Sequence, residues 1–250
     1  MILLFDIGNT NIGIGLANAG KLVKTFRINT VTTKSFDEYY VSIKELIDVT
    51  CVTDVAICSV VPRVTELLVK VSKKFFNIEP LVVVQGVKTG INLKVDNPRE
   101  VGADLICGAA GVDNNDSPYL VVDLGTAIKY VYVSNMTIKG VIISPGIGIS
   151  VKALVGNTAL LPDIDIEVPK NVLGNNTVSC MQSGVTYGIA CQIDGLVERI
   201  MEETKDKELA VYLTGGLATI ISPIVKTKII YDSKIVLKGL LNIYNRNGRK

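Results

Sequence analysis

MILLFDIGNTNIGIGLA, residues 1–17, is the stretch of sequence that decides the fold. Its apolar run over residues 1–5 is typical of a buried strand, and that strand ends at Asp6. The Gly-Asn-Thr sequence of residues 8–10 then favours a tight turn. Because apolar and smaller residues alternate over residues 12–16, we expect a second strand to return beside the first. The stretch therefore predicts a β-hairpin with a carboxylate at the end of its first strand.

The tip of this hairpin has the chemistry of a phosphate-binding loop. Gly8, Asn9 and Thr10 would present backbone N–H groups and a hydroxyl to an anion. Asp6 would hold a hydrated Mg²⁺, an ion that usually binds one or two carboxylates together with substrate phosphates. The loop is not a Walker A motif, because the pattern G-x-x-x-x-G-K-[ST] does not occur in the chain.

A second copy of the arrangement occupies residues 119–133, near the middle of the chain. An apolar strand ends there at Asp123, and Gly125 and Thr126 lead into a strand rich in β-branched and aromatic residues. One such loop would be a weak signal, because many loops of this composition only turn the chain. Two copies, each closing a strand, predict a duplicated domain that holds a nucleotide phosphate chain between two facing hairpins.

Composition restricts the class of protein. The 250 residues, 48% of them hydrophobic, suffice for one large domain or two modest domains with a well-filled core. A net charge of +2 gives no case for a nucleic-acid partner. We expect no membrane span and no secretory signal, because the apolar runs are short and Asp6 interrupts the first of them. The five cysteines, without C-x-x-C spacing, are typical of thiols in a reducing cytoplasm.

The chain contains no histidine. This excludes catalysis by Ser-His-Asp or Cys-His groups, and it excludes zinc held by histidine. A general base must then be a carboxylate, a lysine, a tyrosine or a cysteine.

Strands and helices alternate along the chain, which favours an α/β architecture. Turn-forming residues at 113–118 indicate a boundary between an N-terminal domain, residues 1–114, and a C-terminal domain, residues 115–250. Beyond the two hairpins, strands are expected over residues 21–29, 54–61, 81–84 and 210–214, and a strand leading into a Gly-rich loop over residues 139–148. Helices are expected over residues 37–49, 63–76, 99–112, 149–159 and 234–245, and residues 218–226 are ambiguous. A further long helix is expected to follow a cap at Asn176 and Thr177 and to continue to about residue 203.

The two loops resemble those of the actin-like ATPase superfamily, which includes sugar kinases. Six further motifs, in this order, make nearly the whole chain similar to the type III pantothenate kinases: Ser59–Pro62, Asn97–Asp104, Ser144–Gly146, Thr214–Gly216, Lys238–Leu240 and Tyr244–Asn247. The resemblance implies duplicated actin-like (ribonuclease H-like) domains with the nucleotide cleft between them. It implies ATP-dependent phosphorylation of pantothenate to 4′-phosphopantothenate, the first step of coenzyme A synthesis. It also implies a homodimer with the substrate pocket at the subunit interface.

The resemblance assigns roles to individual residues. Gly102, Ala103 and Asp104 would bind pantothenate, and Asp104 would accept the proton from its primary hydroxyl. Asp123 would lie near a monovalent cation, potassium or ammonium. Thr177 matches a threonine that contacts pantothenate or the cation, although its position before an expected helix predicts a capping role equally well. The Thr214–Gly216 turn would let an adenine or a ribose approach the backbone.

The chain departs from the family pattern in places that concern the substrate. Leu105 stands where the family has an arginine that helps bind the pantothenate carboxylate, and Lys129 follows the second loop in place of a threonine. Our hypothesis is that Lys129 supplies a replacement cation for substrate binding. Two alternatives stay open on the sequence: a non-catalytic nucleotide-binding or regulatory relative, and a kinase for another small hydroxyl substrate.

Overall fold

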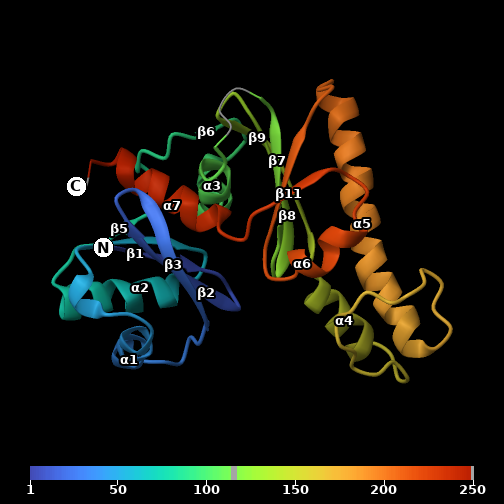
Figure 1. The fold of residues 1–250 in the computed structure, drawn as a ribbon, viewed down its shortest axis with the longest axis horizontal. Helices are drawn as coiled ribbons and strands as arrows, with labels where there is room; N and C mark the ends of the chain where they lie inside the picture. Colours follow the sequence, from blue (N-terminus) through green and yellow to red (C-terminus); the bar gives the residue numbers. More distant parts are fainter. Residues whose placement is uncertain (114–116, 249–250) are drawn as a thin grey trace. The chain divides into compact units, whose positions relative to one another are not determined.

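The computed structural model describes residues 1–113 and 117–248 and contains two units (Figure 1). The first unit consists of residues 1–113, 136–138 and 234–248, and the second of residues 117–135 and 139–233. The expected boundary between residues 114 and 115 lies outside the described residues. Residues 234–248 group with the first unit, although the sequence placed them in a C-terminal domain of residues 115–250.

The strands of the first unit are β1 (Ile2–Ile7), β2 (Asn11–Asn18), β3 (Lys21–Asn29), β4 (Asp54–Ser59) and β5 (Leu81–Val82). They form one sheet in the order β3-β2-β1-β4-β5. β1 and β2 are the hairpin predicted from the opening sequence, and β3 extends it in antiparallel fashion. β4 runs parallel to β1, and β5 runs parallel to β4. The prediction of three N-terminal strands is confirmed.

The α-helices of the first unit are α1 (Phe36–Leu46), α2 (Pro62–Val71), α3 (Ala103–Ala110) and α7 (Ile235–Arg246). α1 and α2 lie on one side of the sheet and α7 lies on the other (Figure 1). Leu3, Phe5 and Ile7 of β1 belong to the same buried cluster as side chains of α1 and α2. Because successive residues of a strand point to opposite faces, Asp6 points to the side of α7.

The strands of the second unit are β7 (Tyr119–Leu124), β8 (Ala127–Ser134), β9 (Thr137–Pro145), β10 (Ala210–Thr214) and β11 (Ile229–Tyr231). Their order, β11-β10-β7-β8-β9, repeats the order β5-β4-β1-β2-β3 of the first sheet. In both sheets the first two strands are antiparallel, and the fourth strand runs parallel to the first. The predicted duplication is therefore confirmed at the level of topology. A short strand β6 (Asn92–Leu93) pairs with residues 137 and 138 at the start of β9.

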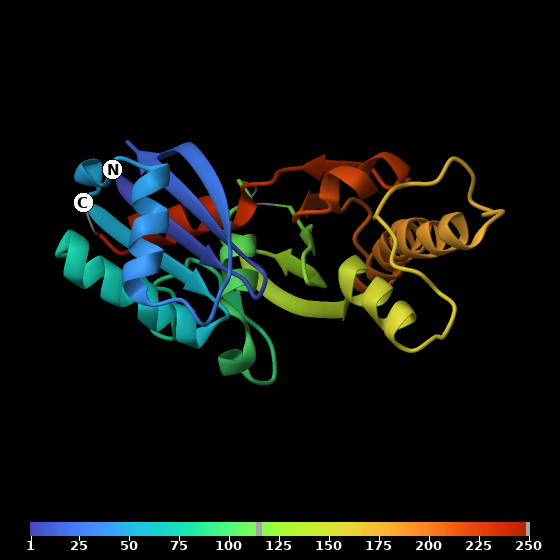
Figure 2. The same cartoon turned by 90° about the horizontal axis from the view of Figure 1, so that it is seen from below.

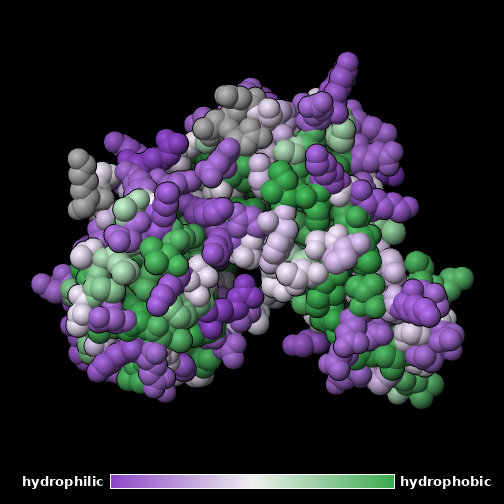
Figure 3. Space-filling model, viewed as in Figure 1, coloured by the Kyte–Doolittle hydropathy of each residue, from purple (hydrophilic) through white to green (hydrophobic). Residues whose placement is uncertain are grey.

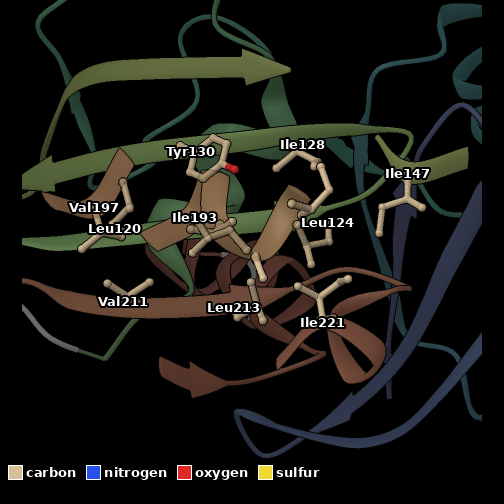
Figure 4. Packing of buried hydrophobic residues seen from close by; sticks show 14 of the residues in the cluster. Leu120, Leu124, Ile128, Tyr130, Ile147, Ile193, Val197, Val211, Leu213 and Ile221 are labelled. Atoms are coloured by element: carbon tan, nitrogen blue, oxygen red, sulfur yellow. The ribbon is translucent and has the colours of Figure 1, made fainter. Parts of the chain in front are cut away.

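The helices of the second unit are α4 (Ile147–Gly156), α5 (Thr177–Thr204) and α6 (Ala218–Ile221). Side chains of all three pack with Leu120, Leu124, Ile128 and Tyr130 of the β7–β8 hairpin in one apolar cluster (Figure 4). Between α4 and α5 the chain forms a long connection without regular structure, residues 157–176 (Figure 2). The exposed connection expected over residues 163–174 is confirmed.

Several element boundaries differ from the sequence prediction. The helix expected over residues 99–112 begins only at Ala103, because Val101 and Gly102 are extended after a 3₁₀ turn at Pro98–Glu100. α2 continues as a π-helical turn over Ser72–Phe76. The ambiguous residues 218–226 contain α6 and a 3₁₀ turn. β11 was not predicted.

Over residues 1–113 and 117–248, none of the helices combines the length and the apolar character that crossing a lipid bilayer demands.

Candidate active site

The first loop is held by the neighbouring strand. The Gly8 N–H donates to the Asn11 carbonyl oxygen at 3.0 Å, which closes the turn. Thr30, just after β3, donates its hydroxyl to the Gly8 carbonyl at 2.6 Å and its N–H to the Thr10 carbonyl at 2.9 Å. Asn9 and Thr10 are exposed at the tip. The loop therefore has a fixed backbone and side chains that face solvent, as a phosphate loop requires.

Asp6 lies half-buried at the end of β1, beside this loop. Its partner in β2 is Gly13, and a Cβ atom added to Gly13 would lie 3.6 Å from the Cβ of Asp6. Its partner in β4 is Cys58. The glycine contributes neither a side chain nor a charge over the carboxylate, which suits a carboxylate that receives a hydrated Mg²⁺.

Asp104 lies in the first turn of α3, with its carboxylate folded back over Gly102. A Cβ atom at Gly102 would come within 2.5 Å of Asp104 Oδ1, so a side chain at this position would displace the carboxylate from its present place. The same oxygen accepts the N–H of Leu105 at 2.9 Å. The first turn of a helix is the end where its dipole stabilises a negative charge.

Two buried thiols, those of Cys58 and Cys107, lie near the two aspartates of the first unit. Cys58 neighbours Asp6 across the sheet, and Cys107 lies one helical turn after Asp104 on α3. The pKa of Cys58 is raised well above its ordinary value, first by the hydrogen bond with the Cys107 thiol and then by burial. The negative charges of Asp6 and Asp104 also raise this pKa. Both carboxylates therefore lie within electrostatic reach of one thiol.

The last helix fixes α3 in place. A Cβ atom at Gly239 of α7 would lie 1.7 Å from the Cys107 carbonyl oxygen, and one at Gly111 would lie 1.9 Å from the Ile235 carbonyl oxygen. The two helices thus approach backbone to backbone. The Asn242 amide also donates to the Ala110 carbonyl at 2.9 Å. Gly239, the middle residue of the Lys238–Leu240 motif, therefore lets α7 support α3, the helix that carries Asp104.

The C-terminal motif Tyr244–Asn247 also has structural roles. The buried Tyr244 hydroxyl donates to Asp54 Oδ2 at 2.8 Å, at the start of β4. The Asn247 amide exchanges two hydrogen bonds with the backbone of Lys88. These contacts attach the chain end to the first sheet and to the loop before β6.

The second loop is supported by a different segment. Gly125 is half-buried and Thr126 is exposed in the turn between β7 and β8. The Gly146 N–H donates to the Thr126 carbonyl at 3.1 Å, and a Cβ atom at Gly146 would come within 2.4 Å of the Gly125 and Thr126 carbonyl oxygens. Only a glycine allows the Ser-Pro-Gly segment to approach the loop this closely.

Asp123 has a lysine as its cross-strand neighbour. Asp123 in β7 pairs with Lys129 in β8, and Lys129 Nζ lies 2.7 Å from Asp123 Oδ2. The two side chains are only 21% and 19% exposed. The ion pair therefore lies at the base of the second loop, largely shielded from solvent.

The Thr214–Gly216 turn follows β10 next to this pair, because Thr214 pairs with Asp123 in the parallel register. Gly215 has φ of +101°, and a Cβ atom there would come within 2.6 Å of the Leu124 backbone. The close packing of the turn against β7 therefore explains why residue 215 is a glycine.

Thr177 is the first residue of α5 and is exposed. The cap of this helix is made by Asn176, whose side chain accepts the Ser179 N–H at 2.9 Å. The side chain that caps α5 is therefore that of Asn176 and not that of Thr177. The contact of Thr177 with pantothenate or a cation stays a prediction.

Each unit thus brings its own group of predicted residues together. The first contains the Asp6 loop with Gly102, Ala103 and Asp104, and the second contains the Gly125–Thr126 loop with Asp123 and Lys129. Sequence reasoning missed the Cys58–Cys107 pair, for which the spacing gave no signal. Among the described residues no group of three or more acidic, cysteine or histidine side chains could hold a metal ion.

Comparison with known proteins decides the family. The family model for type III pantothenate kinase matches residues 2–199. The chain is 52% identical over 247 residues to a type III pantothenate kinase of Acholeplasma laidlawii, and the match covers 99% of each chain. The chain belongs to the type III pantothenate kinase family. The recognition made from the two loops and six motifs is confirmed.

Solved structures place this family member in the actin-like ATPase and sugar kinase fold. A Campylobacter jejuni protein described as a Baf family transcriptional activator has a TM-score of 0.65 at 23% identity, with 99% of this chain and 100% of that chain covered. A Sinorhizobium meliloti protein described as a 2-dehydro-3-deoxygalactonokinase has a TM-score of 0.59 at 11% identity, with 100% and 98% covered. These similarities concern the fold, and they confirm the predicted fold class.

The two departures from the family pattern have different surroundings. Leu105 is 8% exposed, so an apolar side chain is buried where the family resemblance implies an arginine. Lys129 is engaged with Asp123 within its own unit.

Proposed function

We propose that the chain transfers the γ-phosphoryl group of ATP to the primary hydroxyl of pantothenate, giving 4′-phosphopantothenate. Membership of the family supports this reaction. The observation that carries it is the placement of Asp6 and Asp104 within one unit, where Asp6 pairs with Cys58 in the sheet and Asp104 lies one helical turn before Cys107 on α3. A phosphate-loop carboxylate and a candidate base in one unit are what a kinase requires.

Each carboxylate has a distinct task in this proposal. Asp104 orients the hydroxyl of pantothenate and takes its proton. Because phosphoryl transfer passes through a loose transition state, the proton moves late and a carboxylate of ordinary basicity suffices. Asp6 would hold a hydrated Mg²⁺, which supplies neutralisation of phosphate charge when it is bound. Gly8, Asn9 and Thr10 would position the phosphate chain.

The second phosphate loop has its own candidate ligands. Gly125 and Thr126 would bind phosphate through backbone N–H groups and a hydroxyl. Gly102, Ala103 and Thr177 would contact pantothenate, as the resemblance to the family implies. The Thr214–Gly216 turn would approach the nucleoside.

Replacing the candidate base tests the reaction. Asp104→Asn keeps the shape of the side chain and its hydrogen bond to the Leu105 N–H, but it cannot accept the proton. We expect kcat with pantothenate to fall by about 10²- to 10⁴-fold, whereas binding of an ATP analogue by calorimetry stays unchanged. Asp96→Asn, at an exposed carboxylate in the preceding loop, is the matched control. Undiminished turnover by Asp104→Asn would contradict the role of Asp104.

The second unit has a surface that favours a homodimer. Leu160 and Leu173, both in the connection between α4 and α5, are 91% and 88% exposed. The connection is nevertheless tied to α5, because Ser183 donates to the Val172 carbonyl and Gln182 donates to the Asp165 carbonyl. Figure 3 shows apolar side chains reaching the surface in this region. In this proposal a second copy covers these leucines, because a contiguous exposed apolar surface marks an interaction site.

The cytoplasm is the compartment that we propose for the enzyme. All five cysteines are free thiols, and Cys180 and Cys191 are exposed. Exposed unpaired thiols are typical of a reducing environment.

A further inference from the structure

We propose that Lys129 supplies the positive charge at the second phosphate loop from within the chain, so that turnover does not depend on a dissolved monovalent cation at Asp123. This inference rests on the proposed kinase function. It concerns the role of Lys129 as a positioning residue, and it replaces the hypothesis that Lys129 binds the carboxylate of the substrate.

The first observation is the ion pair itself. Lys129 Nζ lies 2.7 Å from Asp123 Oδ2, and each side chain is about four-fifths shielded from solvent. The backbone register fixes this contact, because Asp123 and Lys129 are direct partners across the antiparallel β7–β8 pair. An ion pair held by strand register needs little rearrangement of long side chains, unlike a surface pair.

The second observation is the contrast between the two copies of the hairpin. Asp6 and Asp123 occupy equivalent places, each one residue before the end of its strand. The cross-strand partner is Gly13 for Asp6 and Lys129 for Asp123. One aspartate thus faces a residue without a side chain, and the other faces a fixed ammonium group. The duplicated fold has given its two carboxylates different cross-strand neighbours.

These surroundings do not fit a potassium or ammonium ion at Asp123. A dissolved cation would have to share the carboxylate with an ammonium group at hydrogen-bond distance, and like charges repel. The shielding of the pair strengthens this repulsion, because little solvent screens it. The carboxylate also has no need of a second cation, since Lys129 already compensates its negative charge beside the loop that would bind phosphate.

The first part of the test measures the wild-type enzyme with potassium, ammonium, sodium or tetramethylammonium chloride at one ionic strength. We expect kcat and both KM values to agree within about twofold across the four salts. A requirement for potassium or ammonium, seen as a loss of about tenfold or more in tetramethylammonium, would overturn the inference.

The second part removes the internal cation. In Lys129→Ala we expect kcat to fall by about 10²-fold, and we expect ammonium or methylammonium to restore much of the loss. Lys129→Arg keeps the charge and is expected to stay independent of the salt. Lys139→Ala, at an exposed lysine of β9 whose Nζ lies 3.3 Å from Ser134 Oγ, is the matched control and should neither lose turnover nor respond to ammonium. Thermal unfolding midpoints verify that each variant is folded.

Three results with Lys129→Ala would overturn the inference: unchanged turnover, a loss that no cation restores in a folded variant, or a rise in the pantothenate KM alone. The last result would return Lys129 to binding of the substrate carboxylate.

A third measurement separates this inference from the proposed function. Binding of a non-hydrolysable ATP analogue with Mg²⁺, followed by calorimetry, should be insensitive to the salt in the wild type and become sensitive to it in Lys129→Ala. If no phosphorylation of pantothenate occurs in any salt, the proposed acceptor is wrong, while this binding pattern still supports the role of Lys129. Binding by the wild type that needs potassium would overturn the role of Lys129, whatever the acceptor is.

Discussion

At the scale of a single residue, Tyr130 shows how a core polar atom without a partner affects stability. Its side chain is 1% exposed among apolar side chains of the second unit (Figure 4). Within the described residues its hydroxyl is buried and finds no hydrogen-bond partner. A buried hydroxyl without a partner costs free energy, so its removal should be favourable. We expect Tyr130→Phe to raise the free energy of unfolding by about 1 kcal/mol in urea titrations at neutral pH.

The neighbouring tyrosine on the same face of β8 is the control with the opposite sign. The Tyr132 hydroxyl donates to the Asp206 carboxylate. Tyr132→Phe removes a hydrogen bond to a charged group and should lower the free energy of unfolding by about 1–2 kcal/mol. If both variants destabilised the protein equally, the Tyr130 hydroxyl would have a partner after all.

The pH dependence gives the Tyr130 variant a second signature. Burial raises the pKa of Tyr130 to about 12, above the ordinary value of 10.0. The folded state therefore holds this proton more tightly than the unfolded state, and stability is lost as the pH rises from 10 towards 12. Tyr130→Phe should show a smaller loss over this interval than the wild type.

Candidate residues could be named from the sequence only where a local motif or the family resemblance marks them. Asp6 stands out in the sequence because a Gly-Asn-Thr turn follows it, whereas Asp104 was singled out by the resemblance to the family. The pairing of Asp123 with Lys129 depends on the register of β7 and β8, which the length and geometry of the turn at Gly125 and Thr126 set. The sequence therefore showed Lys129 as a departure but could not show its partner.

At the scale of elements, the packing of α3 on α7 determines where Asp104 lies. Gly239→Ala would place a methyl group 1.7 Å from the Cys107 carbonyl oxygen, so the two helices must separate. Overpacking of this kind typically costs about 1–3 kcal/mol, and more where backbone must move. We expect a loss of unfolding free energy of at least this size, together with a lower kcat because α3 carries Asp104.

A glycine in another helix provides the matched control for this substitution. Gly188 of α5 is exposed, and nothing lies within 4 Å of a Cβ atom added there. Gly188→Ala should stabilise the helix by about 0.5–1 kcal/mol and leave kcat unchanged. Equal stability of the Gly239→Ala protein and the wild type in the same urea titration would contradict the backbone contact.

Elements differ in how far the sequence predicted them. α5 was predicted closely because its apolar side chains keep helical spacing over many turns. β11 has only three residues and was missed, since so short a segment shows no periodicity. α7 was predicted as a helix, but its place on the first sheet is a tertiary contact between distant segments that no local pattern reveals.

At the scale of the whole molecule, two sheets with one strand order explain why a single sequence motif occurs twice. Each copy presents a loop after its first strand, and each loop has a different support: Thr30 in the first unit and Gly146 in the second. The copies have therefore diverged in their charges and supports while the topology stayed the same. The repeat of the motif predicted this duplication, because a strand, an aspartate and a Gly-Thr or Asn-Thr turn recur together.

The exposed leucines of the second unit lead to a prediction about assembly. If a second copy covers Leu160 and Leu173, the enzyme should have twice the chain mass of 26.9 kDa in solution, and light scattering after size exclusion measures this. Leu160→Asp with Leu173→Asp would introduce charges into the covered surface and should give a monomer, because burying unpaired charges is strongly unfavourable. Val23→Asp, at a 54% exposed valine of β3 in the first unit, should leave the mass unchanged. A wild-type mass of one chain, or a dimer that survives both leucine substitutions, would show that this surface is not the interface. Monomers that still bind the ATP analogue but no longer turn over pantothenate would further indicate that the acceptor site needs both copies.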